Sequence, residues 1–140
     1  MAESTCTKAS SAMTAVYDRD VHSVATHHTL KVSMPLGTCA AEERSELNPI
    51  DLMAMGLASC LLIVMGKVAV KEKLDMLGAT ADVSYALDGY RIKSFAIQVN
   101  LPKKLSVADQ AKLEAASKEC PLYLAIGPDV AVTVNFKWPA

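Results

Sequence analysis

The chain of 140 residues and 14.9 kDa is long enough for one domain and too short for two ordinary ones. Apolar residues make up 51% of the chain and charged residues 21%, which excludes an intrinsically disordered protein. The net charge of −1 and the pI of about 6.3 argue against nucleic acid as a partner, because phosphates require a basic surface. We expect a single globular domain over residues 1–140, with a flexible terminus at 1–12.

The sequence lacks features of secreted, membrane-spanning and metal-binding proteins. Residues 1–12 are small and polar and do not resemble a secretory signal. The longest uncharged apolar run, Leu52–Gly66, is shorter than the roughly 20 residues of a membrane-spanning helix, so we predict a buried helix and no membrane. The four cysteines have neither C-x-x-C spacing nor a histidine at ligand spacing, which argues against a metal site. The even number of cysteines is compatible with structural disulfides, but nothing else indicates secretion. We predict a cytoplasmic protein, in which free thiols are either inert core residues or take part in chemistry.

The N-terminal third of the chain has the alternating pattern of β-strands. Ala15 and Tyr17 alternate with polar neighbours, and apolar residues alternate again over 30–34. A loop is expected over 36–47, where Gly37 and a charged run interrupt the pattern.

A long helix is predicted to follow this loop. Asn48 suits the N-cap, Pro49 the first helical position and Asp51 the first turn, and the helix is expected to end near Leu77. It is apolar nearly all round until Lys67, so other structure must surround it. A chain of this size has little material for that purpose, and a partner subunit is expected to supply some.

The second half of the chain predicts a hairpin, a helix and a closing strand. Two alternating segments, 83–87 and 95–101, flank a two-residue turn signal at 88–89. Ser106-x-x-Asp109 resembles a capping box that opens a helix to about Glu119, and a Val-rich strand closes the chain. The order of elements is typical of an α+β protein with a mostly antiparallel sheet.

Two cysteines are candidates for chemistry, and each also has a structural interpretation. Cys60 lies midway along the apolar helix, where free cysteine is commonly a small core residue. Cys120 precedes Pro121 and is the expected N-cap of a short helix, where free backbone amides lower the pKa of a thiol. It is equally suited to filling a junction between helices. Cys6 and Cys39 are not expected to be catalytic.

The remaining polar candidates have ordinary structural interpretations. His22, His27 and His28 fall in one strand-like segment and are expected at the surface. Arg19, between two aspartates, is typical of a solvated turn. The seven methionines are more typical of core packing than of metal ligation.

Two segments together resemble a known family. The segments 48–52 (NPIDL) and 58–60 (ASC) are similar to the start of the central helix in the OsmC/Ohr family of thiol peroxidases. Cys120-Pro121 resembles the second cysteine motif of that family, and the order of elements agrees over roughly 13–138. The resemblance implies an intertwined homodimer in which antiparallel sheets wrap around long central helices.

The resemblance also implies an activity. Cys60 would attack an organic hydroperoxide and become a sulfenic acid, and Cys120 would resolve it as a disulfide. A dithiol such as a lipoylated protein would act as the reductant, and no metal or other cofactor is needed. An arginine steadies the thiolate in this family, and Arg19 has about the right spacing from Cys60, with Arg44 as the alternative. Such an enzyme serves in oxidative stress defence.

The chain departs from the family pattern at one important position. The family glutamate that holds the arginine corresponds to Ile50. Asp51, Glu46 or Glu43 is the candidate replacement, with Asp51 the nearest in sequence. Leu122 also stands in a segment where small polar residues are common. These departures leave a second interpretation open, in which the same dimeric fold binds a small hydrophobic ligand at its interface and its cysteines are structural.

Overall fold

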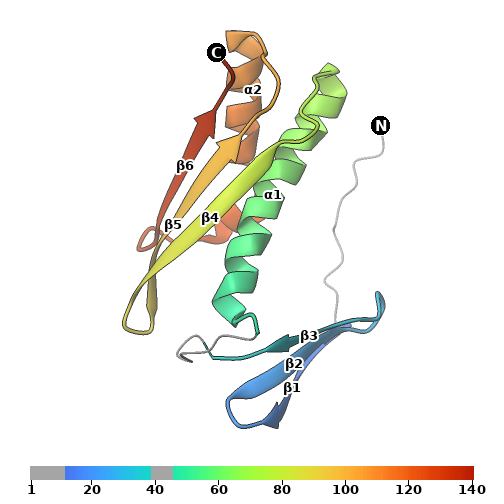
Figure 1. The fold of residues 1–140 in the computed structure, drawn as a ribbon, viewed down its shortest axis with the longest axis vertical. Helices are drawn as coiled ribbons and strands as arrows, with labels where there is room; N and C mark the ends of the chain where they lie inside the picture. Colours follow the sequence, from blue (N-terminus) through green and yellow to red (C-terminus); the bar gives the residue numbers. More distant parts are fainter. Residues whose placement is uncertain (1–11, 39–45) are drawn as a thin grey trace. The chain divides into compact units, whose positions relative to one another are not determined.

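The computed structural model describes residues 12–38 and 46–140, and it has the expected α+β composition (Figure 1). The chain divides into two compact units, Met1–Asp51 and Leu52–Ala140. Each unit has its own three-stranded sheet. Four residues of the sequence analysis lie outside the described residues, namely Cys6, Cys39, Glu43 and Arg44. So do residues 1–11 of the terminus 1–12 that the sequence predicted to be flexible.

The N-terminal unit contains an antiparallel meander. Its strands are β1 (Met13–Arg19), β2 (His22–His27) and β3 (Val32–Leu36), in the order β1-β2-β3. Arg19 pairs with His22 across a two-residue turn, and the register shifts at Asp18. Val21 in this turn has a φ of 45°, a left-handed conformation that is strained for a β-branched residue. The turn and the irregularity together set the directions of the neighbouring polar side chains.

Helix α1 (Pro49–Glu72) begins where the sequence predicted. The side-chain oxygen of Asn48 accepts hydrogen bonds from the backbone N–H groups of Ile50 and Asp51, at 2.7 and 3.0 Å. The carboxylate of Asp51 accepts the backbone N–H of Asn48 in return, at 3.0 Å. This reciprocal arrangement is a capping box, and it fixes the start of the helix.

The predicted end of this helix near Leu77 is wrong, because α1 ends at Glu72. Lys73 adopts a left-handed conformation with a φ of 56°. Its N–H bonds to the carbonyl of Val70, and the N–H of Leu74 bonds to the carbonyl of Ala69. This pair of bonds is a Schellman motif, which stops the helix with lysine at the position that glycine usually occupies.

The second sheet contains β4 (Thr80–Asp88), β5 (Arg91–Asn100) and β6 (Ala131–Lys137). β4 and β5 form the predicted hairpin, but Asp88 pairs with Arg91, so the turn residues are Gly89 and Tyr90 and not the pair at 88–89. Gly89 has a φ of 60°, which glycine adopts without strain. β6 runs parallel to β5, so the otherwise antiparallel arrangement contains one parallel pair.

Two helices form the crossover that a parallel connection requires. Helix α2 (Val107–Ser117) begins at the predicted cap, where the Ser106 hydroxyl accepts the backbone N–H of Asp109 at 3.1 Å. Helix α3 (Pro121–Ala125) has Cys120 as its N-cap, again as predicted. The chain then enters β6, whose alternate residues are half-buried.

The core of the second unit lies between α1 and the β4-β5-β6 sheet, which run side by side in Figure 1. One stripe of α1 is buried, at intervals of three and four residues. The buried stripe consists of Ala54, Leu57, Ala58, Leu61, Met65 and Ala69. All of these residues except Ala58 form one core cluster with Phe95, Ile97 and Val99 of β5, which positions the middle of α1 against the sheet.

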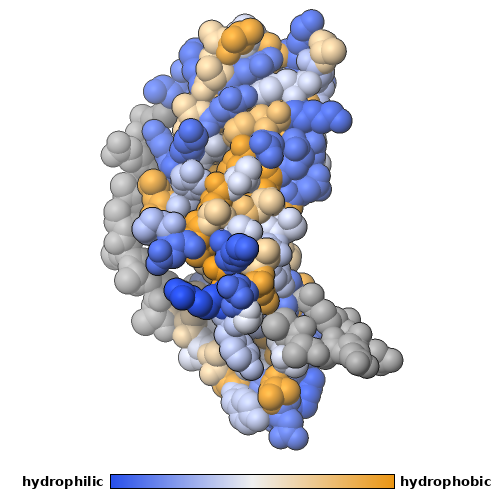
Figure 2. Space-filling view, turned by 90° about the vertical axis from the view of Figure 1, so that its left-hand side faces the viewer, coloured by the Kyte–Doolittle hydropathy of each residue, from blue (hydrophilic) through white to orange (hydrophobic). Residues whose placement is uncertain are grey.

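Many large apolar side chains remain exposed on the single chain. On α1 these are Met53, Met55, Ile63 and Val70. Figure 2 shows hydrophobic residues reaching the surface between hydrophilic ones. By length and composition α1 is also apolar enough to cross a membrane, with 33% of its most apolar window buried. A core helix passes the same test, and the buried stripe of α1 is part of the core described above.

Candidate active site

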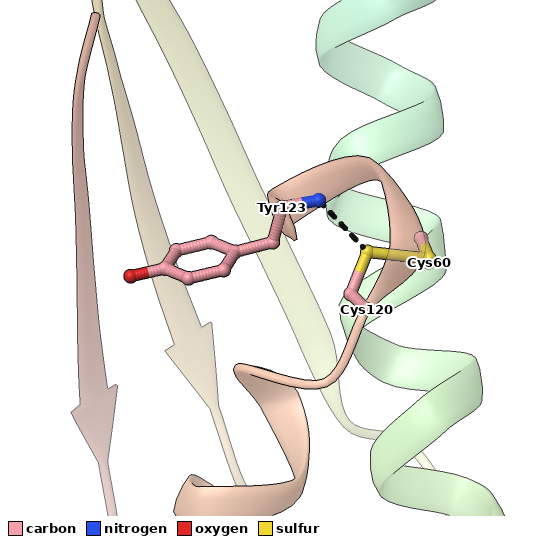
Figure 3. The surroundings of a disulfide bond; sticks show 3 residues. All are labelled: Cys60, Cys120 and Tyr123. Atoms are coloured by element: carbon pink, nitrogen blue, oxygen red, sulfur yellow. Dashed lines mark hydrogen bonds between the residues drawn. A yellow bond between two sulfur atoms is a disulfide. The ribbon is translucent and has the colours of Figure 1, made fainter. Parts of the chain in front are cut away.

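The structure joins Cys60 and Cys120 in a disulfide, with their Cα atoms 5.9 Å apart. Cys60 lies in the middle of α1, and Cys120 lies immediately before α3. The two residues are 60 positions apart in sequence, and the second unit brings them together (Figure 3). The sequence marked both as candidates, and only the family resemblance linked them.

The position of Cys120 follows from local sequence. Pro121 occupies the first turn of α3, so Cys120 becomes the N-cap. Its sulfur accepts the backbone N–H of Tyr123 at 3.4 Å, as Figure 3 shows. The residue is fully buried. Backbone contacts therefore hold this sulfur in place on its own helix.

Cys60 is half-buried and packs at the edge of the core. One turn earlier, a Cβ atom at Gly56 would lie 3.5 Å from the Cδ1 atom of Leu122. This distance is an ordinary van der Waals contact, so Leu122 lies beside Gly56 and α3 lies against α1 next to the cysteine pair. The Tyr123 ring points away from the disulfide (Figure 3) and packs against the core.

A second polar cluster lies in the N-terminal unit and contains Arg19. Two carboxylates and two basic groups alternate in a closed ring. Arg19 lies 3.2 Å from Glu46 Oε1 and 3.5 Å from Asp18 Oδ2, measured from its Nη2 and Nη1 atoms. The Nδ1 atom of His22 bonds to Asp18 Oδ1, and its Nε2 atom lies 2.9 Å from Glu46 Oε2.

Burial differs across this ring. The side chain of His22 is 5% exposed, whereas that of Arg19 is 61% exposed. The hydrogen bond from His22 is the main influence that lowers the pKa of Asp18, and the charge of Arg19 also lowers it. The Nε2 atom of His22 is buried and has no hydrogen-bond partner among the described residues, although Glu46 Oε2 lies 2.9 Å away.

The three candidate replacements for the family glutamate have different positions. Glu46 contacts Arg19, whereas the Asp51 carboxylate takes part in the capping box of α1. Glu43 lies outside the described residues. Of the two described carboxylates, Glu46 is therefore the one that the structure pairs with the candidate arginine.

Sequence reasoning missed His22, which it placed at the surface. The structure buries this residue and sets it opposite Arg19 in the β1–β2 pairing. The close spacing of Asp18, Arg19 and His22 around a two-residue turn was the available signal, since residues directly opposite on paired strands are neighbours. Over residues 12–38 and 46–140, no group of three or more potential ligand residues could hold a metal ion.

The chain matches a model of one protein family. A model described as OsmC-like protein matches residues 41–135 of the chain. No curated protein sequence matches the chain significantly.

Several solved structures share the fold. A protein from Psychrobacter arcticus, named as a candidate osmotic stress induced and detoxification response protein, is 23% identical with a TM-score of 0.82, over 93% of this chain and 98% of that one. The organic hydroperoxide resistance protein OhrB of Bacillus subtilis is 22% identical with a TM-score of 0.67, over 89% and 97%. An organic hydroperoxide resistance protein OsmC from Legionella pneumophila is 25% identical with a TM-score of 0.65, over 89% and 94%.

Proposed function

The chain belongs to the OsmC-like protein family, and we propose that it is a thiol-dependent peroxidase that reduces organic hydroperoxides in oxidative stress defence. The pairing of Cys60 with Cys120 is the observation that carries this proposal. Structural neighbours named as organic hydroperoxide resistance proteins support the choice of substrate class.

The proposed reaction uses the two thiols in sequence. The Cys60 thiolate attacks the O–O bond of the hydroperoxide, which yields a sulfenic acid on Cys60 and releases the alcohol. The Cys120 thiol then attacks the sulfenic sulfur, forms the disulfide and releases water. A dithiol such as a lipoylated protein restores both thiols. The net change is the reduction of one hydroperoxide to alcohol and water by two thiols of the reductant.

Arg19 is proposed to stabilise the Cys60 thiolate by its charge, as the family resemblance implies. A nearby cation favours the reactive ionised form of a thiol. Within the N-terminal unit, Glu46 holds the guanidinium and so takes the part of the family glutamate that Ile50 replaces. Asp51 supports the helix that carries Cys60 through its cap.

The proposal includes a cytoplasmic homodimer. A three-stranded sheet requires a covered apolar face for stability, yet Met13, Val16, Tyr17 and Val32 of the β1-β2-β3 sheet are exposed. The four exposed apolar residues of α1 have the same requirement. A second copy of the chain would cover both surfaces.

A second candidate function is binding of a small hydrophobic ligand without peroxide chemistry. Leu122 and Leu124 of α3 are 44% and 69% exposed, and they lie on the helix that follows Cys120. In this alternative the disulfide is structural.

The first test is the intact mass of the reduced protein before and after one equivalent of cumene hydroperoxide, with peptide mapping. We expect a loss of two hydrogens that maps to Cys60 and Cys120. Cys60→Ser should abolish peroxide consumption, whereas Cys120→Ser should permit one turnover and then over-oxidation. Cys6→Ser is the matched control and should leave the reaction unchanged. Two free thiols after treatment would instead favour the binding function.

The role of Arg19 has a separate test. Arg19→Ala should slow peroxide consumption, and Arg91→Ala, at the β4–β5 turn, is the matched control for removal of an arginine. An unchanged rate in the Arg19 variant would move the role to Arg44.

A further inference from the structure

The N-terminal ring contains a residue that the proposed mechanism does not use. His22 is the most buried of the four ring members, with 5% of its side chain exposed. The exposed fractions of Glu46, Asp18 and Arg19 are 27%, 33% and 61%. Burial of an imidazole between two carboxylates needs compensation, since polar groups lose their hydration when they leave water. The hydrogen bond between Nδ1 and Asp18 supplies this compensation on one side, and the Glu46 carboxylate lies 2.9 Å from Nε2 on the other.

Each carboxylate divides its two oxygens between the two basic groups. Asp18 directs Oδ1 to His22 and Oδ2 to Arg19, and Glu46 directs Oε2 to His22 and Oε1 to Arg19. The buried imidazole therefore restricts both carboxylates, and both carboxylates restrict the guanidinium. Without the imidazole, Arg19 and its partners would be long or exposed side chains with many available rotamers.

The chemistry of the imidazole suits this position. Its Nδ1 atom lies against Asp18 and its Nε2 atom against Glu46, so one rigid side chain stands between the two carboxylates. An imidazole has only two rotatable side-chain bonds, so its burial fixes the places of both contacts.

From this geometry we infer that His22 is a positioning residue, which fixes the orientation of Arg19 through Glu46 and Asp18. The inference rests on the proposed function for its effect on peroxide reduction. The effect of His22 on the reaction passes through Arg19.

A double-mutant cycle separates positioning from a general structural role. His22→Gln should lower the rate of hydroperoxide reduction by about tenfold to a hundredfold, the range for a group that orients another functional group. In an Arg19→Ala background, the same substitution should change the rate by less than about twofold, because there is no guanidinium left to orient. His28→Gln, at an exposed histidine that contacts Thr14, is the matched control and should leave the rate unchanged.

A second measurement does not depend on activity. The ring holds Arg19 through Nη1 and Nη2, so rotation about the Cζ–Nη bonds, measured from the Nη signals in ¹H–¹⁵N spectra, should be slow in the wild-type protein and faster in His22→Gln and His22→Asn. The Asn variant provides a second, smaller replacement if the Gln variant does not fold.

The outcomes distinguish the two proposals. The positioning role would be overturned if His22→Gln lowered the rate equally with Arg19 present and in the Arg19→Ala protein, or if it lowered the rate in neither. An unchanged Arg19 signal in both His22 variants would also overturn it. If the wild-type protein reduces no hydroperoxide, the proposed function fails, and the Arg19 signal alone decides the role of His22.

Discussion

Reduction of the Cys60–Cys120 disulfide should destabilise the protein by an amount that the length of the closed loop predicts. The two cysteines are 60 positions apart. In the chain-entropy model the cross-link lowers the entropy of the unfolded chain by 2.1 + 1.5R ln n, which for this loop is about 14 cal/mol/K. At 25 °C this corresponds to about 4 kcal/mol of stability, or about a thousandfold in the folding equilibrium constant.

The assay is urea unfolding of the oxidised and the reduced protein. With an m-value of about 2 kcal/mol/M, the midpoint should fall by about 2 M on reduction. The oxidised protein should also have the smaller m-value, because its cross-linked unfolded state exposes less surface. Cys6→Ser and Cys39→Ser, combined in one background, prevent other disulfides from contributing.

A variant with Cys60→Ala and Cys120→Ala is the control, and its midpoint should not respond to reductant. If the oxidised and reduced proteins unfold at the same urea concentration, loop closure in the unfolded state does not determine the stability of this fold. The result also bears on function, since a redox cycle requires that the reduced protein remains folded.

Three further predictions concern the elements around the site. Leu61→Ala removes a fully buried side chain from the stripe of α1 and should lower the free energy of unfolding by about 2–5 kcal/mol in urea unfolding. A loss below about 1 kcal/mol would contradict the packing. Asn48→Ala removes the N-cap of α1 and should cost about 0.5–2 kcal/mol, and an unchanged thermal midpoint would refute the capping role. The pKa of Asp18 is lowered from 3.8, so its carboxylate stabilises the fold above that pH and loses this effect as the pH falls through and below about 4. The stability difference between wild type and Asp18→Asn should therefore shrink between pH 6 and pH 3, and a constant difference would contradict the pairing with His22.

The elements that the sequence predicted correctly are those whose signals are local. The caps at Asn48, Ser106 and Cys120 each use a side chain and a backbone group within three residues, so the sequence contains the whole interaction. The alternation of apolar residues likewise identified the hairpin that β4 and β5 form.

The sequence predicted the end of the long helix and the position of the hairpin turn wrongly, because the usual local residue signal differs there from the backbone geometry of the structure. Gly78 suggested the end of the long helix, yet Lys73 adopts the left-handed conformation that ends it five residues earlier than Gly78. The Asp88-Gly89 pair suggested a turn, but the register places the turn one residue later. In both cases hydrogen bonding over several residues decided between alternatives that composition alone leaves equal.

The site itself depends on long-range contacts that no local pattern contains. Cys60 and Cys120 were each recognisable as candidates, but their proximity results from the packing of α3 against α1. The spacing of Arg19 and His22 around the turn indicates that they are neighbours, but it does not indicate burial, because histidine occurs in both exposed and buried positions. Its environment forms only when Glu46, 24 positions further along the chain, lies against it.

In the proposed function, Glu46 supplies the carboxylate that the family motif has at the position of Ile50. A carboxylate at position 50 would lie in the first turn of α1, whereas Glu46 lies before the helix and reaches Arg19 from there. A single exposed pair of this kind contributes only about 0–1 kcal/mol, because solvent and side-chain entropy oppose it. The ring with Asp18 and His22 lowers this entropic opposition, since a side chain already held by one partner loses less freedom to the next. If the proposed positioning role is right, Arg19 therefore depends on the buried His22 for its orientation.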